Sequence, residues 1–235
     1  MNFKDFIITD RENRNSEKFE GTFLDYLEIV KQNPDVAKLS HKRLYDFIMS
    51  KGVEVLKADE NPRIRKIYGN ETIREYGYFK DDFFGIDKVI MKIVNYLHSA
   101  SMKGEESRQV LYLVGPVGAG KSSLVESLKS ALVHCEPIYS IKGCPMHEEP
   151  LHLVPNHLRD EFNKMLGAQI EGDLCPVCKY RLLHEFNGEY ENFPVERKGF
   201  SIRSRKGIGV VPPVDPNNQD TSILTGSIDI SKMDM

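Results

Sequence analysis

The stretch that decides the fold is VLYLVGPVGAGKSSLVESLK, residues 110–129. Residues 115–122 at its centre match the phosphate-loop pattern G-x-x-x-x-G-K-[ST] at every fixed position. The apolar residues 110–114 predict a short strand buried on both faces, and the residues after the loop have helical spacing. With a further strand expected at 137–141, this order predicts the α/β sheet of a P-loop nucleotide-binding core.

The chemistry of the loop predicts which residues contact a nucleotide. Its glycines let backbone N–H groups turn toward phosphate oxygens, and the next helix presents the positive end of its dipole to the same anion. We expect Lys121 to reach the β- and γ-phosphates and Ser122 to bind Mg²⁺. ATP is expected rather than GTP, although the loop itself does not select the base. The expected contact residues are Gly115, Pro116, Val117, Gly118, Ala119, Gly120, Lys121, Ser122 and Ser123.

The acidic strand that a P-loop hydrolase needs is harder to find. Such a strand ends in Asp or Asp-Glu, which binds Mg²⁺ and orients the attacking water. The best candidate, residues 208–215, contains Pro212 and Pro213, which a central strand does not accept, and residues 228–230 are too short. We therefore assign no catalytic residue. We expect either nucleotide binding without a complete catalytic set or a fragment of a longer protein.

The residues before the loop predict a small helical domain. Apolar stripes at helical spacing run through residues 16–32 and 40–52, and a charged, irregular stretch from Lys57 to Arg74 follows them. A third helix is expected from Ile86 to Leu97. The predicted organisation is a helical N-terminal domain, residues 1–75, followed by an incomplete P-loop domain, residues 76–235.

Composition restricts the partners. The 235 residues are 40% hydrophobic and 29% charged, with 32 Lys and Arg against 35 Asp and Glu, so no global charge favours nucleic acid or an acidic membrane. The basic segment 195–207 is interpreted as a solvated hairpin, with phosphate, RNA or an acidic partner as the alternative. Neither a secretion signal nor an apolar stretch long enough to span a bilayer is visible, so a cytoplasmic location is expected.

Cysteine and histidine residues are concentrated in one part of the chain. Nine of the eleven lie between His134 and His184, about a fifth of the chain. The pairs Cys144/His147 and Cys175/Cys178 have the two-residue spacing of a zinc knuckle and together predict a structural Cys₃His zinc site in an insertion at residues 144–180. His152 is an alternative to His147. A redox pair and simple buried thiols remain open.

Several motifs together resemble a known family. Phe83-Phe84-Gly85-Ile86-Asp87 and the phosphate loop resemble the entry to an AAA+ ATPase module. More narrowly, GPVGAGKSSLVESLK, CPMHEEPLHLVP at 144–155, GDLCPVC at 172–178 and VPPVDPNNQD at 211–220 resemble the N-terminal AAA region of PrkA-type serine protein kinases.

The resemblance implies an ATP-binding protein of bacterial stress or sporulation physiology, truncated relative to its family, with serine protein kinase or ATP-dependent protease activity. It also implies a protein substrate and a homo-oligomer in the full-length form. Contacts to ATP and Mg²⁺ carry over only to Gly115, Gly120, Lys121 and Ser122. Protein-kinase signatures such as His-Arg-Asp or Asp-Phe-Gly do not occur in the chain.

Overall fold

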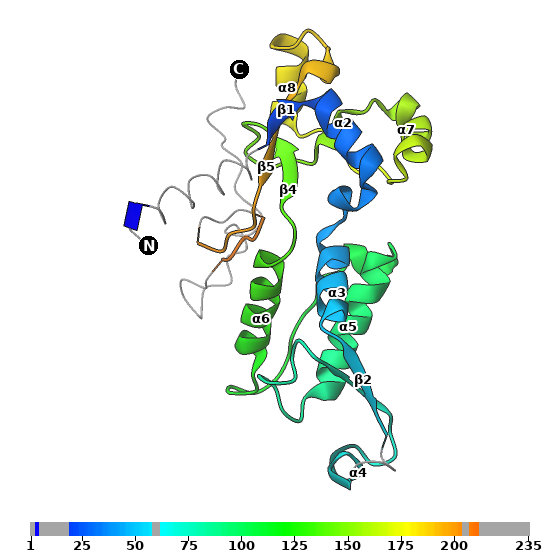
Figure 1. Ribbon diagram of the computed structural model, residues 1–235, viewed down its shortest axis with the longest axis vertical. Helices are drawn as coiled ribbons and strands as arrows, with labels where there is room; N and C mark the ends of the chain where they lie inside the picture. Colours follow the sequence, from blue (N-terminus) through cyan, green and yellow to red (C-terminus); the bar gives the residue numbers. More distant parts are fainter. Residues whose placement is uncertain (1–2, 5–18, 58–61, 204–206, 212–235) are drawn as a thin grey trace, which may run out of the picture.

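The computed structural model describes residues 3–4, 19–57, 62–203 and 207–211, and their helices and strands gather around two hydrophobic cores (Figure 1). The first core combines residues 23–30 with residues 141–195. The second core is formed by residues 44–131. The chain therefore leaves the first core, builds the second, and returns to the first.

The first core packs against a three-stranded antiparallel sheet. The strand order is β1 (Glu20–Thr22), β5 (Pro194–Lys198) and β4 (Ile138–Ile141), with β5 in the centre. Figure 1 shows α2, α7 and α8 around this sheet at one end of the molecule. The helical elements here are α2 (Phe23–Gln32), η1 (Pro34–Ala37), η3 (Pro150–Leu153), η4 (Asn156–Leu158), α7 (Arg159–Leu166), α8 (Pro176–His184) and η5 (Tyr190–Asn192).

The second core lies between three helices that run side by side at the other end of the molecule (Figure 1). These are α3 (Ser40–Ser50), α5 (Asp87–Ser101) and α6 (Lys121–Val133). The strands β2 (Val53–Leu56) and β3 (Ile73–Tyr76) pair as a hairpin that extends beyond the three helices, and the connection between these strands contains α4 (Pro62–Tyr68). The short helix η2 (Glu105–Arg108) follows α5. In the part of the chain that the structure describes, no helix is long and apolar enough to cross a bilayer.

Local sequence signals explain where the first helices begin and end. The helix expected from residue 16 begins at Phe23, because Thr22 and Asp25 form a capping box in which the Asp25 carboxylate accepts from the Thr22 N–H at 2.7 Å. The helix from Ser40 ends before Gly52, whose φ of +89° favours glycine. The connection expected at 57–74 contains α4 and the first two residues of β3.

The two cores do not separate residues 1–75 from the rest of the chain. Helix α2 contributes to the first core and α3 to the second, and each packs on residues beyond position 75. A helical N-terminal domain and its boundary at residue 75 stay predictions.

The strand expected at 110–114 is wrong for this structure. The segment forms neither a helix nor a strand, and Val110, Tyr112 and Val114 are 90%, 82% and 81% exposed. A strand is stable only with a partner for its backbone groups. The predicted neighbour, β4, pairs with β5 in an antiparallel manner instead. The sheet expected to join residues 110–114 to residues 137–141 is therefore absent from the described part of the chain.

The basic segment at 195–207 is not a solvated hairpin in its first half. Residues 195–198 belong to β5, the central strand of its sheet, and the Val195 side chain is fully buried. Arg205 and Lys206 lie outside the described residues. Residues 16–18 of the expected first helix also lie outside them, as do residues 212–215 of the first candidate acidic strand and residues 228–230, the second candidate.

A single arginine holds the junction between the two cores. The Arg43 guanidinium on α3 is buried and donates to three backbone carbonyls: Val36 at 2.6 Å, Lys38 at 3.0 Å and Glu136 at 3.0 Å. The first two acceptors lie where the chain enters the second core, and Glu136 lies where it returns to β4. Arg43 therefore bonds to both chain segments that connect the two cores.

We expect Arg43→Lys to lower the free energy of unfolding by about 2–4 kcal/mol, because an ammonium group does not reproduce three divergent N–H donors and leaves buried carbonyls without partners. Urea unfolding measures the change. Arg65→Lys on α4 is the matched control, because its exposed side chain predicts a change below about 0.5 kcal/mol. An unchanged midpoint for Arg43→Lys would contradict the proposed role of the junction.

Candidate functional site

Two glycines of the phosphate loop adopt a left-handed backbone conformation. Gly118 and Gly120 have φ values of +81° and +76°, a region that side chains with a Cβ rarely adopt. Helix α6 begins at Lys121, directly after the loop, and Gly120 is its N-cap. The loop residues Gly115 to Ala119 are exposed, so the loop opens to solvent.

The N-terminus of α6 offers free donors to an anion. The first helical hydrogen bond runs from the Leu124 N–H to the Gly120 carbonyl at 2.9 Å, so the N–H groups of residues 121–123 precede the helical ladder. Among the described residues, no side chain caps this end. Ser122 and Ser123 lie exposed in this first turn. Backbone donors and the helix dipole therefore favour a phosphate at this point.

The Lys121 ammonium group is already bent back over the loop. It donates to the Gly115 carbonyl at 2.7 Å and to the Pro116 carbonyl at 2.6 Å. These acceptors are neutral, and a phosphate oxygen is a stronger acceptor because it is charged. The positive charge is thus held where a phosphate would enter.

A cavity of about 530 Å³ adjoins the loop. One wall consists of Ile86, the N-cap of α5, with Val89 and Ile93 from that helix, and another consists of residues 111–114. Residues 115, 116 and 119–121 of the loop complete it. An apolar hollow beside a phosphate-binding loop can hold an aromatic base while its phosphates reach the loop.

Tyr68 fixes the start of the helix that forms this wall. Its hydroxyl group donates to the Asp87 carboxylate and accepts from the Asp87 N–H at 3.4 Å. Burial and this hydrogen bond raise the pKa of Tyr68 to about 12. The contact joins α4 to the first residue of α5, next to Ile86 and Val89 of the cavity.

The cavity lacks an acidic group in the described part of the chain. None of its lining residues is Asp or Glu, and Lys92 and Lys121 are its charged residues. Binding of phosphate is therefore supported by this site, whereas a carboxylate that holds Mg²⁺ or orients water is not supplied by the described residues.

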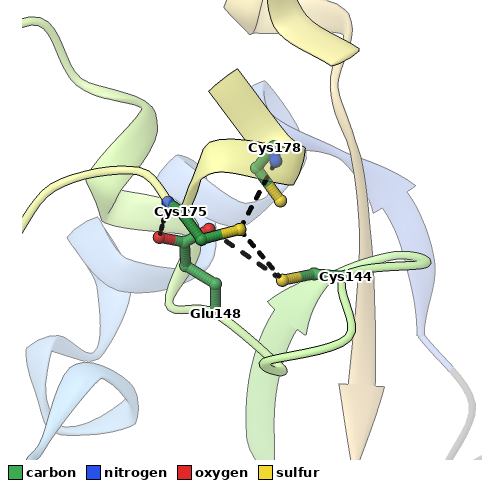
Figure 2. A group of neighbouring side chains, drawn as sticks. All are labelled: Cys144, Glu148, Cys175 and Cys178. Atoms are coloured by element: carbon green, nitrogen blue, oxygen red, sulfur yellow. Dashed lines mark hydrogen bonds between the residues drawn. The ribbon is translucent and has the colours of Figure 1, made fainter. Parts of the chain in front are cut away.

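A second cluster lies in the first core, where three cysteines and a glutamate converge (Figure 2). Cys144 follows β4, Cys175 is the N-cap of α8, and Cys178 lies in the first turn of that helix. The Cys144 and Cys175 sulfur atoms are 3.8 Å apart, and the Cys178 N–H donates to the Cys175 sulfur at 3.4 Å. The structure thus brings together three of the four predicted zinc ligands.

His147, the fourth predicted ligand, does not join this cluster, and Glu148 takes its place. The chain turns sharply after Cys144 and returns beside β4, where the Ile141 N–H donates to the Glu148 carbonyl at 2.9 Å. His147 has a φ of +49° in this turn, and its Nδ1 atom lies 2.9 Å from the Lys198 ammonium nitrogen on β5. The consecutive residues His147 and Glu148 therefore have different partners.

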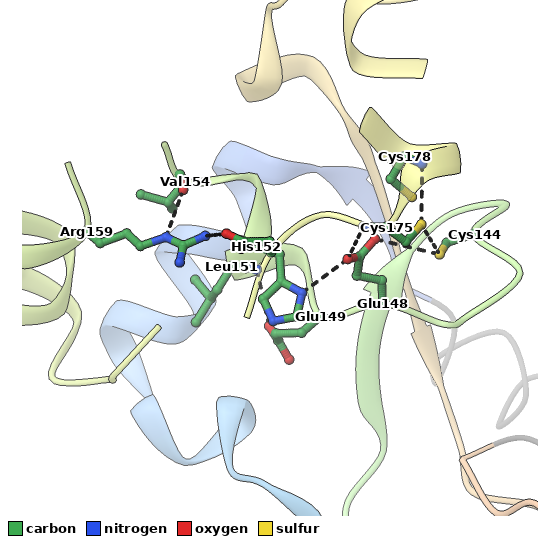
Figure 3. A network of polar contacts seen from close by, with 10 residues as sticks. Cys144, Glu148, Glu149, Leu151, His152, Val154, Arg159, Cys175 and Cys178 are labelled. Carbon is green, nitrogen blue, oxygen red and sulfur yellow. Dashed lines mark hydrogen bonds and ion pairs between the residues drawn. The ribbon is translucent and has the colours of Figure 1, made fainter. Parts of the chain in front are cut away.

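His152, the predicted alternative ligand, contacts Glu148 instead of the sulfur atoms. Figure 3 shows its ring beside the carboxylate, with His152 Nδ1 3.2 Å from Glu148 Oε1. The Cys175 N–H donates to the same oxygen at 2.7 Å. No sequence signal distinguished Glu148 from its neighbours, since Cys-x-x-His is the more familiar spacing.

The thiols have the character of structural rather than redox cysteines. Burial raises the pKa of the Cys175 thiol, and it raises the pKa of the Cys178 thiol well above its ordinary range. A reactive cysteine has a lowered pKa and is accessible. Cys178 is fully buried, which argues against a redox pair.

Comparison with known proteins shows which family the chain resembles over most of its length. The PrkA AAA domain family matches residues 21–235. The chain is 42% identical over 227 residues to the ATP-dependent protease PrkA of Bacillus subtilis. The matched region covers 94% of this chain and 34% of that protein. It is 33% identical to the serine/threonine kinase YeaG of Escherichia coli K12, covering all of this chain and 36% of that protein.

More distant similarity reaches Lon proteases. The Lon protease of Methanosphaera stadtmanae is 34% identical over 114 residues, or 48% of this chain and 13% of that protein. No solved structure matches the chain. The chain spans about a third of the length of the PrkA and YeaG relatives.

We expect Tyr68→Phe to lower the free energy of unfolding by about 1–2 kcal/mol at neutral pH, because the Asp87 carboxylate loses its donor. The pKa of Tyr68 is about 12 in the folded protein and near 10 when unfolded, so this contribution is present below pH 10 and is lost as the pH rises toward 12. Unfolding curves at several pH values test this. The exposed Tyr180→Phe is the control, and an equal, pH-independent difference for both variants would contradict the assignment.

Proposed function

Because the chain belongs to the PrkA AAA domain family, we propose that it is the ATP-binding N-terminal part of a PrkA-like AAA+ protein. The observation that carries the proposal is the phosphate loop itself. Two of its glycines have positive φ values, the Lys121 ammonium group lies over the loop, and no described side chain caps the N-terminus of α6. ATP and Mg²⁺ are the proposed ligands, with Lys121 on the β- and γ-phosphates and Ser122 on the metal.

The adjoining cavity supports a nucleotide rather than a bare phosphate. In the proposed pose the phosphates lie on residues 115–123, and the base enters the apolar hollow against Ile86 and Val89. The loop does not distinguish adenine from guanine. The family relationship favours ATP, since the Bacillus subtilis relative is named an ATP-dependent protease.

The activity of the whole protein is proposed by analogy with its relatives. One is named a serine/threonine kinase and another an ATP-dependent protease, so a protein substrate is proposed in either case. We place the chemical step outside the 235 residues, in the part of the relatives that this chain does not match, with the long form acting as a homo-oligomer. A cytoplasmic location and a role in stress or sporulation belong to the same proposal.

A second function has an observation in its favour. Because no carboxylate lines the cavity in the described residues, the chain as it stands suits a nucleotide-dependent protein-binding module that binds ATP without turnover. The two proposals share the ATP site and differ in hydrolysis.

Lys121→Ala should weaken ATP binding about a hundredfold, equivalent to about 2.7 kcal/mol, because the charge opposite the β- and γ-phosphates is lost. Calorimetric titration with ATP and Mg²⁺ measures the affinity. Circular dichroism should stay unchanged, since the Lys121 ammonium group bonds to carbonyls of its own loop. Lys129→Ala, two turns along α6, is the control that should retain affinity. Equal affinities for the two variants would disprove the assignment of Lys121.

ATP turnover separates the two functions. We expect the 235-residue chain to bind ATP without hydrolysing it, and we expect a longer form that includes the next acidic strand to hydrolyse it. Phosphate release by both forms, at equal nucleotide saturation, is the measurement. Turnover by the short chain would show that a catalytic acid lies within it. Absence of turnover in both forms would favour the binding module.

A further inference from the structure

We propose that Cys144, Glu148, Cys175 and Cys178 bind one structural Zn²⁺ ion through three thiolates and one carboxylate oxygen. This site lies in the first core, whereas the phosphate loop leads into α6 of the second core. The proposal therefore does not depend on nucleotide binding. Glu148 replaces His147 in the ligand set that the sequence predicts.

The spacing of the ligand atoms fits a tetrahedral ion. One ligand atom from each of the four residues lies within 4.8 Å of all the others. A Zn–S bond of about 2.3 Å requires sulfur atoms about 3.8 Å apart in a tetrahedron, and Cys144 and Cys175 have their sulfur atoms 3.8 Å apart. The Cys144 sulfur lies 3.9 Å from Glu148 Oε2, where bonds of about 2.3 and 2.0 Å require about 3.5 Å.

The Glu148 carboxylate is already oriented for this role. Its Oε1 atom accepts from the Cys175 N–H at 2.7 Å and faces His152 Nδ1 at 3.2 Å, which leaves Oε2 directed at the thiols (Figure 3). Outer hydrogen bonds of this kind fix a metal-bound carboxylate. The His152 ring is in turn close to Gly172, where a Cβ atom would lie 2.8 Å from Nε2.

The alternatives account for fewer of these residues. A disulfide between Cys144 and Cys175 leaves the buried Glu148 carboxylate and Cys178 without a purpose. Simple hydrophobic thiols do not explain why Oε2 of a buried carboxylate faces sulfur atoms, because the hydrogen-bond partners of Glu148 at the Cys175 N–H and His152 both contact Oε1. A divalent cation attracts all four ligands and offsets two of their four negative charges, and soft thiolates select Zn²⁺ over Mg²⁺ or Ca²⁺.

The ion would be structural, because four protein ligands leave no open position for a substrate. It would join the turn after β4 to the N-terminus of α8, which are separated by 26 residues that include η3, η4 and α7. Helix α7 contacts α2, and Cys144 and Cys178 belong to the same core as α2. Loss of the ion should therefore loosen the first core.

Metal analysis of the chain purified after growth with zinc tests the proposal. We expect close to one zinc per chain and a lower melting temperature after chelation, restored by adding Zn²⁺ back. A metal-free chain that takes up no added zinc in reduced form and is fully stable would overturn the proposal. A Cys144–Cys175 disulfide in the native protein would also overturn it.

Matched variants test the ligand set. Glu148→Gln should weaken zinc binding at least about tenfold in competition with a chromophoric chelator, whereas His147→Ala should bind as the wild type does. The reverse pattern would overturn the assignment of Glu148.

Cobalt provides a readout that does not depend on variants that fold poorly. The wild-type chain loaded with Co²⁺ should show thiolate-to-metal charge transfer and the visible bands of a tetrahedral ion. An octahedral spectrum without thiolate bands would overturn the proposed coordination.

Discussion

The arrangement of this structure depends on the buried guanidinium group of Arg43. A buried charge needs hydrogen-bond partners on every side, and Arg43 finds them in the backbone at both points where the chain passes between the cores. The carbonyls of Val36 and Lys38 belong to the segment that leads from the first core to the second, and the carbonyl of Glu136 belongs to the segment that leads back. One side chain thereby sets how α6, which carries the phosphate loop, meets β4, which leads to the cysteine cluster.

The phosphate loop was predictable because its signal is local. Loop conformation, helix start and lysine position all follow from eight consecutive residues, and the structure shows the positive φ values at Gly118 and Gly120 that such a loop needs. The helix at 87–101 was predictable for a similar reason, since Ile90, Ile93 and Leu97 place its apolar face without reference to distant residues.

Features that depend on distant partners were less accessible from the sequence. Residues 110–114 have strand composition, but a strand also needs a neighbour, and the described residues supply none. Residues 195–198 are basic enough to suggest a solvated surface, yet β1 and β4 bond to both edges of this strand. In the cysteine cluster, the turn after β4 decides that Glu148 faces the thiols and His147 faces Lys198, and spacing alone carries no information about that turn.

Phosphate binding and ATP hydrolysis place different demands on the chain. Phosphate recognition uses exposed backbone donors and one flexible ammonium group, so it needs only a loop and the end of a helix. Lys121 bonds to the Gly115 and Pro116 carbonyls, and an entering phosphate must take over these contacts. Hydrolysis demands more, because a carboxylate must also be held at a defined distance from the phosphate, and a central strand normally does this. With segment 110–114 unpaired in the described residues, the present arrangement meets the first demand, and the second requires an acidic strand to pair beside that segment.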